Sequence, residues 1–265
     1  MKQRPNLLLG FFLFLFGLSA ALPAQNQPNV ILIIADDIGF SDIGSYGSEI
    51  ETPHLDKLAY DGLRFRNFYN MAKCEPTRSS LFTGRFLPGK NIKNAIPFST
   101  LMHEAGYYTA MVGKEHLMSW VPARCFAVNS FEDSFVFWKI NSFWVPPSGE
   151  FEYPFRLNGV QVKPEDMEVS RKPLFKTDVM TDYAVKFLDK ANASKKPFFL
   201  YLPYHEAHYP LQAREENIAK YRGKYKVGWD KIRAARFAKQ KELGIIPANA
   251  ELSPPEDNIN NSRGP

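Results

Sequence analysis

Cysteine is scarce in this chain, which contains only Cys74 and Cys125 among its 265 residues. Two cysteines cannot build the dense disulfide framework that small secreted domains use in place of a large core. The composition provides another source of stability, because 45% of the residues are hydrophobic and 14% are aromatic. A chain of this length and composition can bury a core of its own, as one domain or as part of a larger one.

Long apolar runs are also lacking. The most pronounced run, residues 7–18, follows Lys2 and Arg4 and precedes small residues that end at Ala24. It is shorter than the roughly 20 residues of a transmembrane helix and matches the pattern of a secretory signal peptide. We therefore predict a signal peptide over residues 1–24, no stable membrane anchor, and export to the periplasm or the extracellular space.

Positive charge is present but is not concentrated. The net charge is +5 and the pI is about 9.0, with lysines and arginines dispersed and many of them in the last fifty residues. Nucleic-acid-binding domains gather such charge into a patch or stripe, so we predict no nucleic-acid partner. An anionic substrate fits this balance, and so does an ordinary basic surface.

A β-branched apolar run at residues 29–35 ends in Asp36 and Asp37. Because it does not alternate with polar residues, it predicts a parallel strand buried on both faces. Active sites in open α/β sheets lie beyond the carboxyl ends of the strands, so we expect both acids to lie in an active site. Adjacent carboxylates repel each other, and a shared calcium or magnesium ion relieves the repulsion. A helix-capping acid with a solvated neighbour is the alternative.

The rest of the chain alternates between strand and helix patterns. Helices are predicted at 52–62, with Leu55, Leu58 and Ala59 on one face, at 99–105, and from a Thr177 cap onward. Strands are predicted at 64–69, 107–112 and 197–202, and residues 120–175 read as a long excursion containing short strands. The pattern predicts an α/β fold with a mostly parallel sheet flanked by helices.

Residues 74–84, CEPTRSSLFTG, place a cysteine, a helix-starting proline and Arg78 within five positions. Because the first helical turn presents unpaired N–H groups, Cys74 and Arg78 are placed to face an anion together. This predicts an anion-binding nucleophile. A buried structural cysteine and a disulfide with Cys125 remain alternatives.

The spacing Cys-x-Pro-x-Arg, followed four residues later by Thr-Gly, resembles the signature of the sulfatases, members of the alkaline-phosphatase superfamily. The strand ending in Asp36 and Asp37 and the intervening residues 52–65 resemble that family too. The resemblance implies that a formylglycine-generating enzyme oxidises Cys74 to formylglycine. It also implies a Ca²⁺ site, with Mg²⁺ as the alternative ion, formed by Asp36, Asp37 and Cys74.

Two further segments resemble sulfatase motifs. Residues 113–116, GKEH, are similar to Gly-Lys-Trp-His, which implies that Lys114 and His116 bind sulfate oxygens while Glu115 points away from them. Residues 204–210 are similar to a segment with Pro-His-x-Pro, which implies that His208 contacts the sulfate and assists the leaving oxygen. His205 would support it, and Arg78 would hold the nucleophile. The implied reaction is hydrolysis of the sulfate ester of a small molecule or glycan.

The chain departs from the family pattern in its last part. Sulfatases continue with an Asp-Asn pair that completes the calcium site and with another lysine, but no Asp-Asn-Gly sequence follows residue 210. We predict a catalytic portion at 25–246, a polar proline-rich tail at 247–265, and a missing C-terminal half, without which the chain is weak or inactive. Two alternatives are a phosphate or phosphonate monoester hydrolase of the same superfamily and an inactive secreted protein that binds sulfated glycans.

Overall fold

The computed structural model describes residues 27–86, 95–116, 130–137, 142–145 and 155–254. The predicted signal peptide, Cys125, parts of the 120–175 excursion and the end of the predicted tail lie outside the described residues. Among the helices that are described, none has the length and apolar character needed to cross a membrane.

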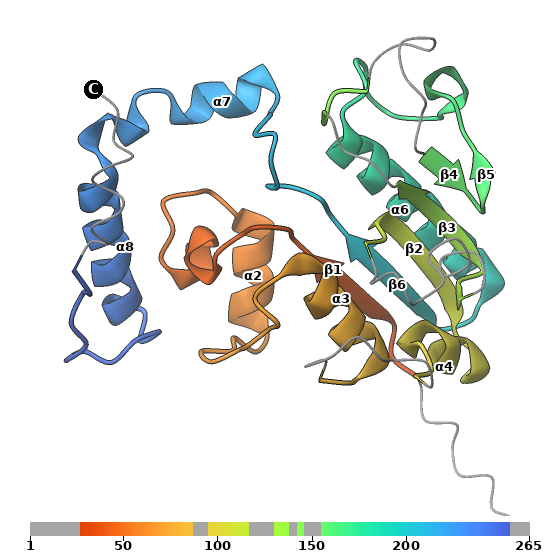
Figure 1. The fold of residues 1–265 in the computed structure, drawn as a ribbon, viewed down its shortest axis with the longest axis horizontal. Helices are drawn as coiled ribbons and strands as arrows, with labels where there is room; N and C mark the ends of the chain where they lie inside the picture. The colour runs from red at the N-terminus through yellow and green to blue at the C-terminus, as the bar shows by residue number, and fades with distance from the viewer. Residues whose placement is uncertain (1–26, 87–94, 117–129, 138–141, 146–154, 255–265) are drawn as a thin grey trace, which may run out of the picture.

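A six-stranded sheet organises the fold, with strand order β1-β6-β2-β3-β4-β5 (Figure 1). The strands are β1 (Val30–Ile34), β2 (Tyr108–Lys114), β3 (Asp133–Phe137), β4 (Phe155–Leu157), β5 (Val160–Gln161) and β6 (Phe198–Pro203). The first four strands in that order pair in parallel, and β4 and β5 complete the sheet antiparallel. The predicted α/β fold with a mostly parallel sheet is therefore confirmed.

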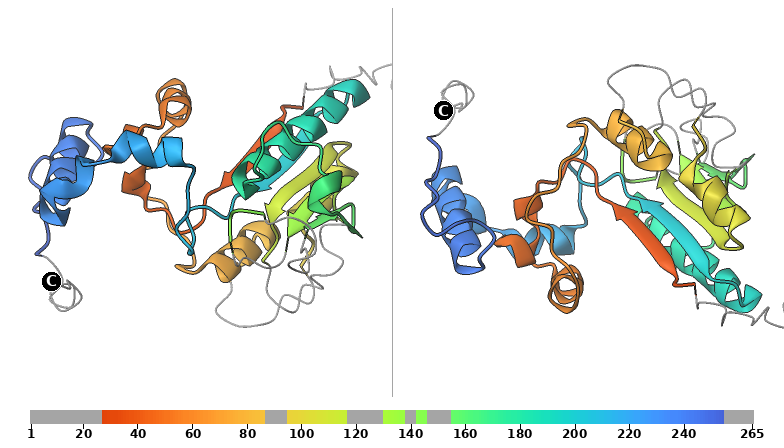
Figure 2. Two further views of the ribbon diagram at one scale, coloured as in Figure 1. Left: turned by 90° about the horizontal axis from the view of Figure 1, so that it is seen from above. Right: turned by 90° about the horizontal axis from the view of Figure 1, so that it is seen from below.

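Helices lie on both faces of the sheet (Figure 2). The α-helices are α2 (Pro53–Asp61), α3 (Cys74–Thr83), α4 (Phe98–Glu104), α6 (Lys176–Ser194), α7 (Glu215–Tyr221) and α8 (Trp229–Glu242). Short 3-10 turns are η1 (Phe40–Asp42), η2 (Gly44–Tyr46), η3 (Pro164–Asp166) and η4 (Lys224–Val227). Helix α6 covers one face, while α3 and α4 cover the other.

The core consists of two apolar clusters separated by the sheet. Helix α6 presents Val179, Met180, Tyr183, Ala184 and Phe187, which pack with alternate residues of β2, β3 and β6. On the opposite face, α3 contributes Phe82 to a cluster that includes the following sheet and loop residues: Met111, Phe131, Val136, Phe199 and Tyr201. Full burial of one such side chain stabilises the fold by about 1.5–3 kcal/mol, so the inner strands are the most strongly fixed.

Strand β1 differs from its prediction, because it is not buried on both faces. Its side chains Val30, Leu32 and Ile34 pack against the second cluster, but Ile31 is 49% and Ile33 is 48% exposed. The main contacts of helix α6 are with β2, β3 and β6. Within the described ranges, no strand pairs with the outer edge of β1. The apolar run is therefore an uncovered edge.

One prediction in the segment between β1 and α3 is wrong. Residues 64–69 form no strand, because their alternating side chains have no neighbouring strand to pair with. Helix α2 exists where it was predicted, and Leu55 and Leu58 on its apolar face are exposed. The sequence pattern shows an apolar face without showing what covers it.

One boundary also needs correction. Helix α6 begins at Lys176 with Phe175 as its N-cap, so Thr177 lies inside the first turn and is not the cap. Strand β3 agrees with the short strands expected within residues 120–175, and it is a buried inner strand paired with β2. Its five residues are too few to show a clear period, and its position is fixed by pairing with β2.

Gly113 allows strands β2 and β6 to approach each other closely where they end. Its φ is +130°, and a Cβ atom at this position would lie 2.2 Å from the carbonyl oxygen of Pro203. Only glycine meets both conditions without strain. This close approach brings Lys114, the next residue, beside the loop that follows β6.

Candidate active site

The carboxyl ends of β1, β2 and β6 converge on one site, as the sequence predicted. The backbone N–H of Asp36 donates to the carbonyl oxygen of Glu206 at 2.9 Å, and the N–H of Tyr204 donates to that of Ile34 at 2.8 Å. These bonds fasten the loop after β1 to the loop after β6. Polar side chains of both loops are thereby held together.

A cleft of about 730 Å³ lies beside β1 and contains the predicted nucleophile. Cys74 is a free, half-buried cysteine at the first position of α3. Asp36, Asp37 and Arg78 line the same cleft. The structure thus brings together the two acids, the cysteine and the arginine that the sequence placed in one site.

The side chain of Arg78 is buried and joins the end of β2 to the loop that follows β6. It is only 1% exposed, and its Nη1 donates to the carbonyl oxygen of Lys114 at 3.1 Å while its Nη2 donates to that of Tyr204 at 3.3 Å. Its Nη2 also lies 3.6 Å from Oδ1 of Asp36. A buried guanidinium requires such partners, because desolvation of an unpaired charge costs several kcal/mol. Sequence patterns did not predict this depth of burial.

The two adjacent acids have different environments. Asp36 is 4% exposed and its Oδ2 forms an ion pair with Nζ of the buried Lys114. Asp37 has a positive φ of 55°, and its side chain faces the open part of the cleft. Carboxylate oxygens suit calcium or magnesium, so the donor chemistry fits a hard cation. Lys114 competes with such a cation for Asp36, and two carboxylates supply only part of a shell of six to eight oxygens.

His205 and His208 stack on each other at the end of β6, with ring centroids 4.7 Å apart. His205 is buried, and burial, reinforced by the positive charge of Lys114, lowers its pKa to about 2. It is therefore neutral at any ordinary pH. His208 is partly exposed, and its Nε2 lies 3.8 Å from Oδ2 of Asp37. His208 thus lies beside Asp37, and its role in the site stays a prediction.

His116 is placed differently from its prediction. Strand β2 ends at Lys114, and His116 has a φ of 34°, so the two residues are not successive outward positions of one extended strand. Glu115 between them is buried at 2% exposure, whereas His116 is exposed. Partial desolvation lowers the pKa of His116, and the charges of Lys114 and Arg78 act in the same direction. His116 therefore lies within electrostatic reach of the site although its side chain is not enclosed by it.

Sequence reasoning missed a buried lysine near the site. Lys176 is 5% exposed, lies over the rings of Phe137 and Phe155 at 5.7 and 6.0 Å, and has its pKa lowered to about 8 by burial. Burial also raises the pKa of the neighbouring Glu206. No local signal identifies Lys176, because an isolated lysine before an amphipathic helix is usually a surface residue.

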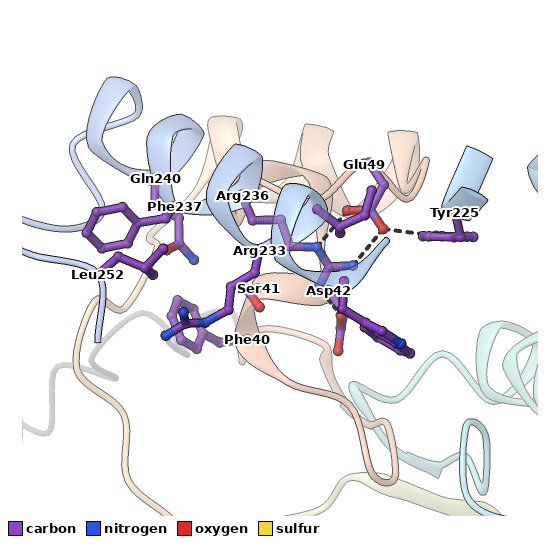
Figure 3. Close-up of a pocket in the computed structure, with 12 residues that line it drawn as sticks. Phe40, Ser41, Asp42, Glu49, Tyr225, Arg233, Arg236, Phe237, Gln240 and Leu252 are labelled. Atoms are coloured by element: carbon purple, nitrogen blue, oxygen red, sulfur yellow. Dashed lines mark hydrogen bonds and ion pairs between the residues drawn. The ribbon is translucent and has the colours of Figure 1, made fainter. Parts of the chain in front are cut away.

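A second pocket, of about 440 Å³, lies between η1 and α8 (Figure 3). Arg236 of α8 binds Glu49 through Nε at 2.6 Å and Nη2 at 2.8 Å, and its Nη1 binds Asp42 at 2.5 Å. The hydrogen bond from Arg236 lowers the pKa of Glu49 to about 2. This contact joins segments almost two hundred residues apart and was not predicted.

Comparison with known proteins places these features in a family. The Sulfatase family profile matches residues 28–261. An uncharacterized sulfatase of Schizosaccharomyces pombe is 35% identical over 268 residues, which cover 87% of this chain and 47% of that protein. An arylsulfatase of Klebsiella aerogenes is 30% identical over 253 residues, covering 86% of this chain and 53% of that protein.

A solved structure agrees with both sequence relatives. Ps i-CgsB, in complex with k-i-k-neocarrahexaose, is 32% identical to this chain with a TM-score of 0.61, covering 83% of this chain and 54% of that one. The chain therefore belongs to the sulfatase family. It spans about half the length of the curated relatives it matches.

Proposed function

We propose that this chain is the nucleophile-bearing part of an exported sulfatase that hydrolyses sulfate esters. The observation that carries the proposal is the shared cleft of Cys74, Asp36, Asp37 and Arg78 in a member of the sulfatase family. The positive end of the α3 dipole adds a favourable field for an anion beside Cys74.

Conversion of Cys74 to formylglycine would supply a hydrated aldehyde, of which one hydroxyl attacks sulfur and the other releases sulfate. A calcium ion, or magnesium in its place, would be held by Asp36, Asp37 and residue 74 and would polarise the sulfate. Arg78 fixes the loops around residue 74 and contributes positive charge that opposes the growing negative charge on the sulfate oxygens.

Three further side chains would act on the substrate. Lys114 would neutralise a sulfate oxygen after exchanging part of its contact with Asp36. His208, partly exposed at the cleft edge, would donate a proton to the leaving oxygen. His116 would bind a sulfate oxygen by turning from its exposed position toward Lys114.

The family and one neighbour support a proposal for the substrate class. A sulfated small molecule or glycan fits the proposed site, and the 32% identity to Ps i-CgsB, which was solved with k-i-k-neocarrahexaose, favours a sulfated glycan. A formylglycine-generating enzyme would be the maturation partner. Residues 1–24 would direct the chain to the periplasm or outside the cell.

We also propose that a second polypeptide segment completes the site along β1. The outer edge of β1 is unpaired within the described residues, and Ile31 and Ile33 are about half exposed. A strand added there would pair with the free backbone groups of β1, and side chains of the same segment would cover Ile31 and Ile33 on the adjacent face. In the family pattern, such a segment would provide an Asp-Asn pair and a lysine next to Asp36 and Asp37.

The nucleophile is tested in a host that co-expresses a formylglycine-generating enzyme, with the complementary half supplied as a second polypeptide. Mass analysis should show that residue 74 has lost its sulfur, and sulfate should be released from an aryl sulfate or from neocarrahexaose. Cys74→Ala should lower release by at least about 10³-fold, while Cys125→Ala should not. Release by Cys74→Ala, or a bridge between residues 74 and 125, would contradict the assignment.

The same preparation separates the alternatives. An aryl phosphate cleaved faster than the matched aryl sulfate would favour the phosphate monoester hydrolase. Glycan binding without turnover, after verified conversion of Cys74 and addition of calcium, would favour a binding protein.

The β1 edge is tested by co-purification of the tagged chain with the complementary half. The double change Ile31→Lys and Ile33→Lys should abolish the complex, because it places charge on the apolar face of β1 that the added segment would cover. Val160→Lys, on the exposed opposite edge strand β5, is the matched control and should leave the complex intact. Equal effects of the two changes would locate the contact elsewhere.

A further inference from the structure

Asp36, His205 and His208 converge on one point at the ends of β1 and β6. Each offers one ligand atom, and the three atoms lie within 4.8 Å of one another. Two imidazoles and one carboxylate form a donor set that suits zinc and other first-row transition metals, whereas calcium and magnesium prefer oxygen ligands throughout. The chemistry of this group therefore differs from that of the Asp36–Asp37 pair.

A second observation, at the buried His205, also points to a bound ligand. His205 is 1% exposed, and its Nδ1 has no hydrogen-bond partner among the described residues. Its ring is held by Phe143 at 5.2 Å and by His208 at 4.7 Å between centroids, so it cannot turn freely toward water. A buried polar atom without a partner costs about 1–3 kcal/mol, and a bound ligand offsets that cost.

The charges around the group act in opposite directions. Lys114 pairs with Oδ2 of Asp36, and Arg78 lies 3.6 Å from its Oδ1, so both oppose a bound cation. Asp37, whose Oδ2 is 3.8 Å from Nε2 of His208, favours one. A bound metal has to displace Lys114 from Asp36, which makes the site reversible and weaker than a structural zinc site. The ligand atoms also have to draw together, since zinc–nitrogen bonds are about 2.0–2.1 Å.

We propose that Asp36, His205 and His208 form a binding site for a divalent transition metal, with Zn²⁺ as the probe ion. The site shares Asp36 with the proposed calcium site, so the two ions exclude each other. Zinc at this position binds Asp36, which releases Lys114 from its ion pair, and it also binds His208. It therefore blocks His208, which is proposed to act on the leaving oxygen, and binding requires neither conversion of Cys74 nor catalytic activity.

The test is a calorimetric titration of ZnCl₂ into the full chain without calcium, repeated with Co²⁺, whose visible absorption reports its coordination. One equivalent should bind. His208→Gln and His205→Gln should each weaken binding at least about tenfold. His54→Gln, an exposed histidine on α2, is the control and should bind as the parent does.

Folding and the cysteines are controlled separately. Circular dichroism and thermal melting show whether His205→Gln is folded, and His208→Gln, which alters a partly exposed residue, provides a second reading if it is not. Cys74→Ser and Cys125→Ser should retain the bound equivalent and the Co²⁺ spectrum. Binding that survives both histidine changes, binding lost with either cysteine, or no binding to the folded parent would overturn the site.

Discussion

Helices α6 and α8 are both long, but they are held to the protein in different ways. Helix α6 buries seven of its residues, most of them apolar, whereas α8 buries only Gln240. The first helix lies on three strands, and the second lies beyond α2, away from the sheet (Figure 1). The comparison teaches that an amphipathic helix becomes part of the core only where another element receives its apolar face.

The attachment of α8 depends mainly on polar contacts. Arg236 binds Asp42 and Glu49, and Tyr225 of η4 donates to Glu49 at 2.9 Å. Apolar side chains of α8, including Trp229 and Phe237, line the second pocket without being buried. The two helices should therefore respond differently to mutation and to pH.

Truncation of one phenylalanine in each helix should show the largest difference. Phe187 of α6 is 2% exposed, and Phe187→Ala should cost about 3–5 kcal/mol because it leaves a cavity in the core. Phe237→Ala in α8 should cost about 1 kcal/mol or less, because that ring is only partly buried. Urea unfolding measures the free energy of unfolding of both variants, provided that their m-values equal that of the parent. Equal costs would show that α8 is as tightly packed as α6.

Acid should loosen α8 before it loosens α6. The folded-state pKa of Glu49 is about 2, below its ordinary 4.5, so the stabilisation is present above pH 4.5 and is lost as the pH falls from 4.5 toward 2. The full difference corresponds to about 3 kcal/mol, which solvent screening at the partly exposed Glu49 reduces to about 2 kcal/mol. Hydrogen exchange should show α8 amides opening in this window.

The matched variants for that experiment are Arg236→Gln and Arg233→Gln. The first removes the partner of Glu49, so α8 should be open already at neutral pH and show no acid step. The second changes an arginine that bonds only to Ser253 among its described contacts, so the acid step should remain. An acid step that persists in Arg236→Gln would assign it to another group.

The smallest effect is expected at the start of α6. Burial lowers the pKa of Lys176 from 10.5 to about 8, so its charge opposes folding below pH 8 and stability recovers as the pH rises from 8 to 10.5. Lys176→Met should raise the unfolding free energy at pH 7 by about 1–2 kcal/mol and reduce this slope. Lys57→Met, on exposed α2, should do neither. A destabilised Lys176→Met would show that its charge is needed by Glu206.

Local patterns predicted much of the fold. Strands β2 and β6 and helices α2 and α4 lie within about two residues of their predicted limits, since their periodicity and end signals are local properties. The position of Asp36 at a strand end also followed from the sequence alone. Strand β3 did not, because five residues take their identity from pairing with β2.

The candidate site was only partly predictable. The cleft containing Cys74, Asp36, Asp37 and Arg78 was expected, but the burial of Arg78 between the backbones of Lys114 and Tyr204 was not. Those carbonyl groups come from the last residue of β2 and from the loop after β6, and no spacing along the chain encodes their meeting. The turn at His116 was missed because the period of a strand does not show where the strand ends.

The sequence by itself determined which residue types lie at the ends of strands and helices, and which family the chain belongs to. Motifs and periodicity depend only on residues that are close together along the chain. The tertiary structure alone decided that Asp36 is buried against Lys114 while Asp37 faces the cleft, and that β1 has one uncovered edge. Burial and charge pairing depend on which distant segments meet, and the sheet order sets those meetings.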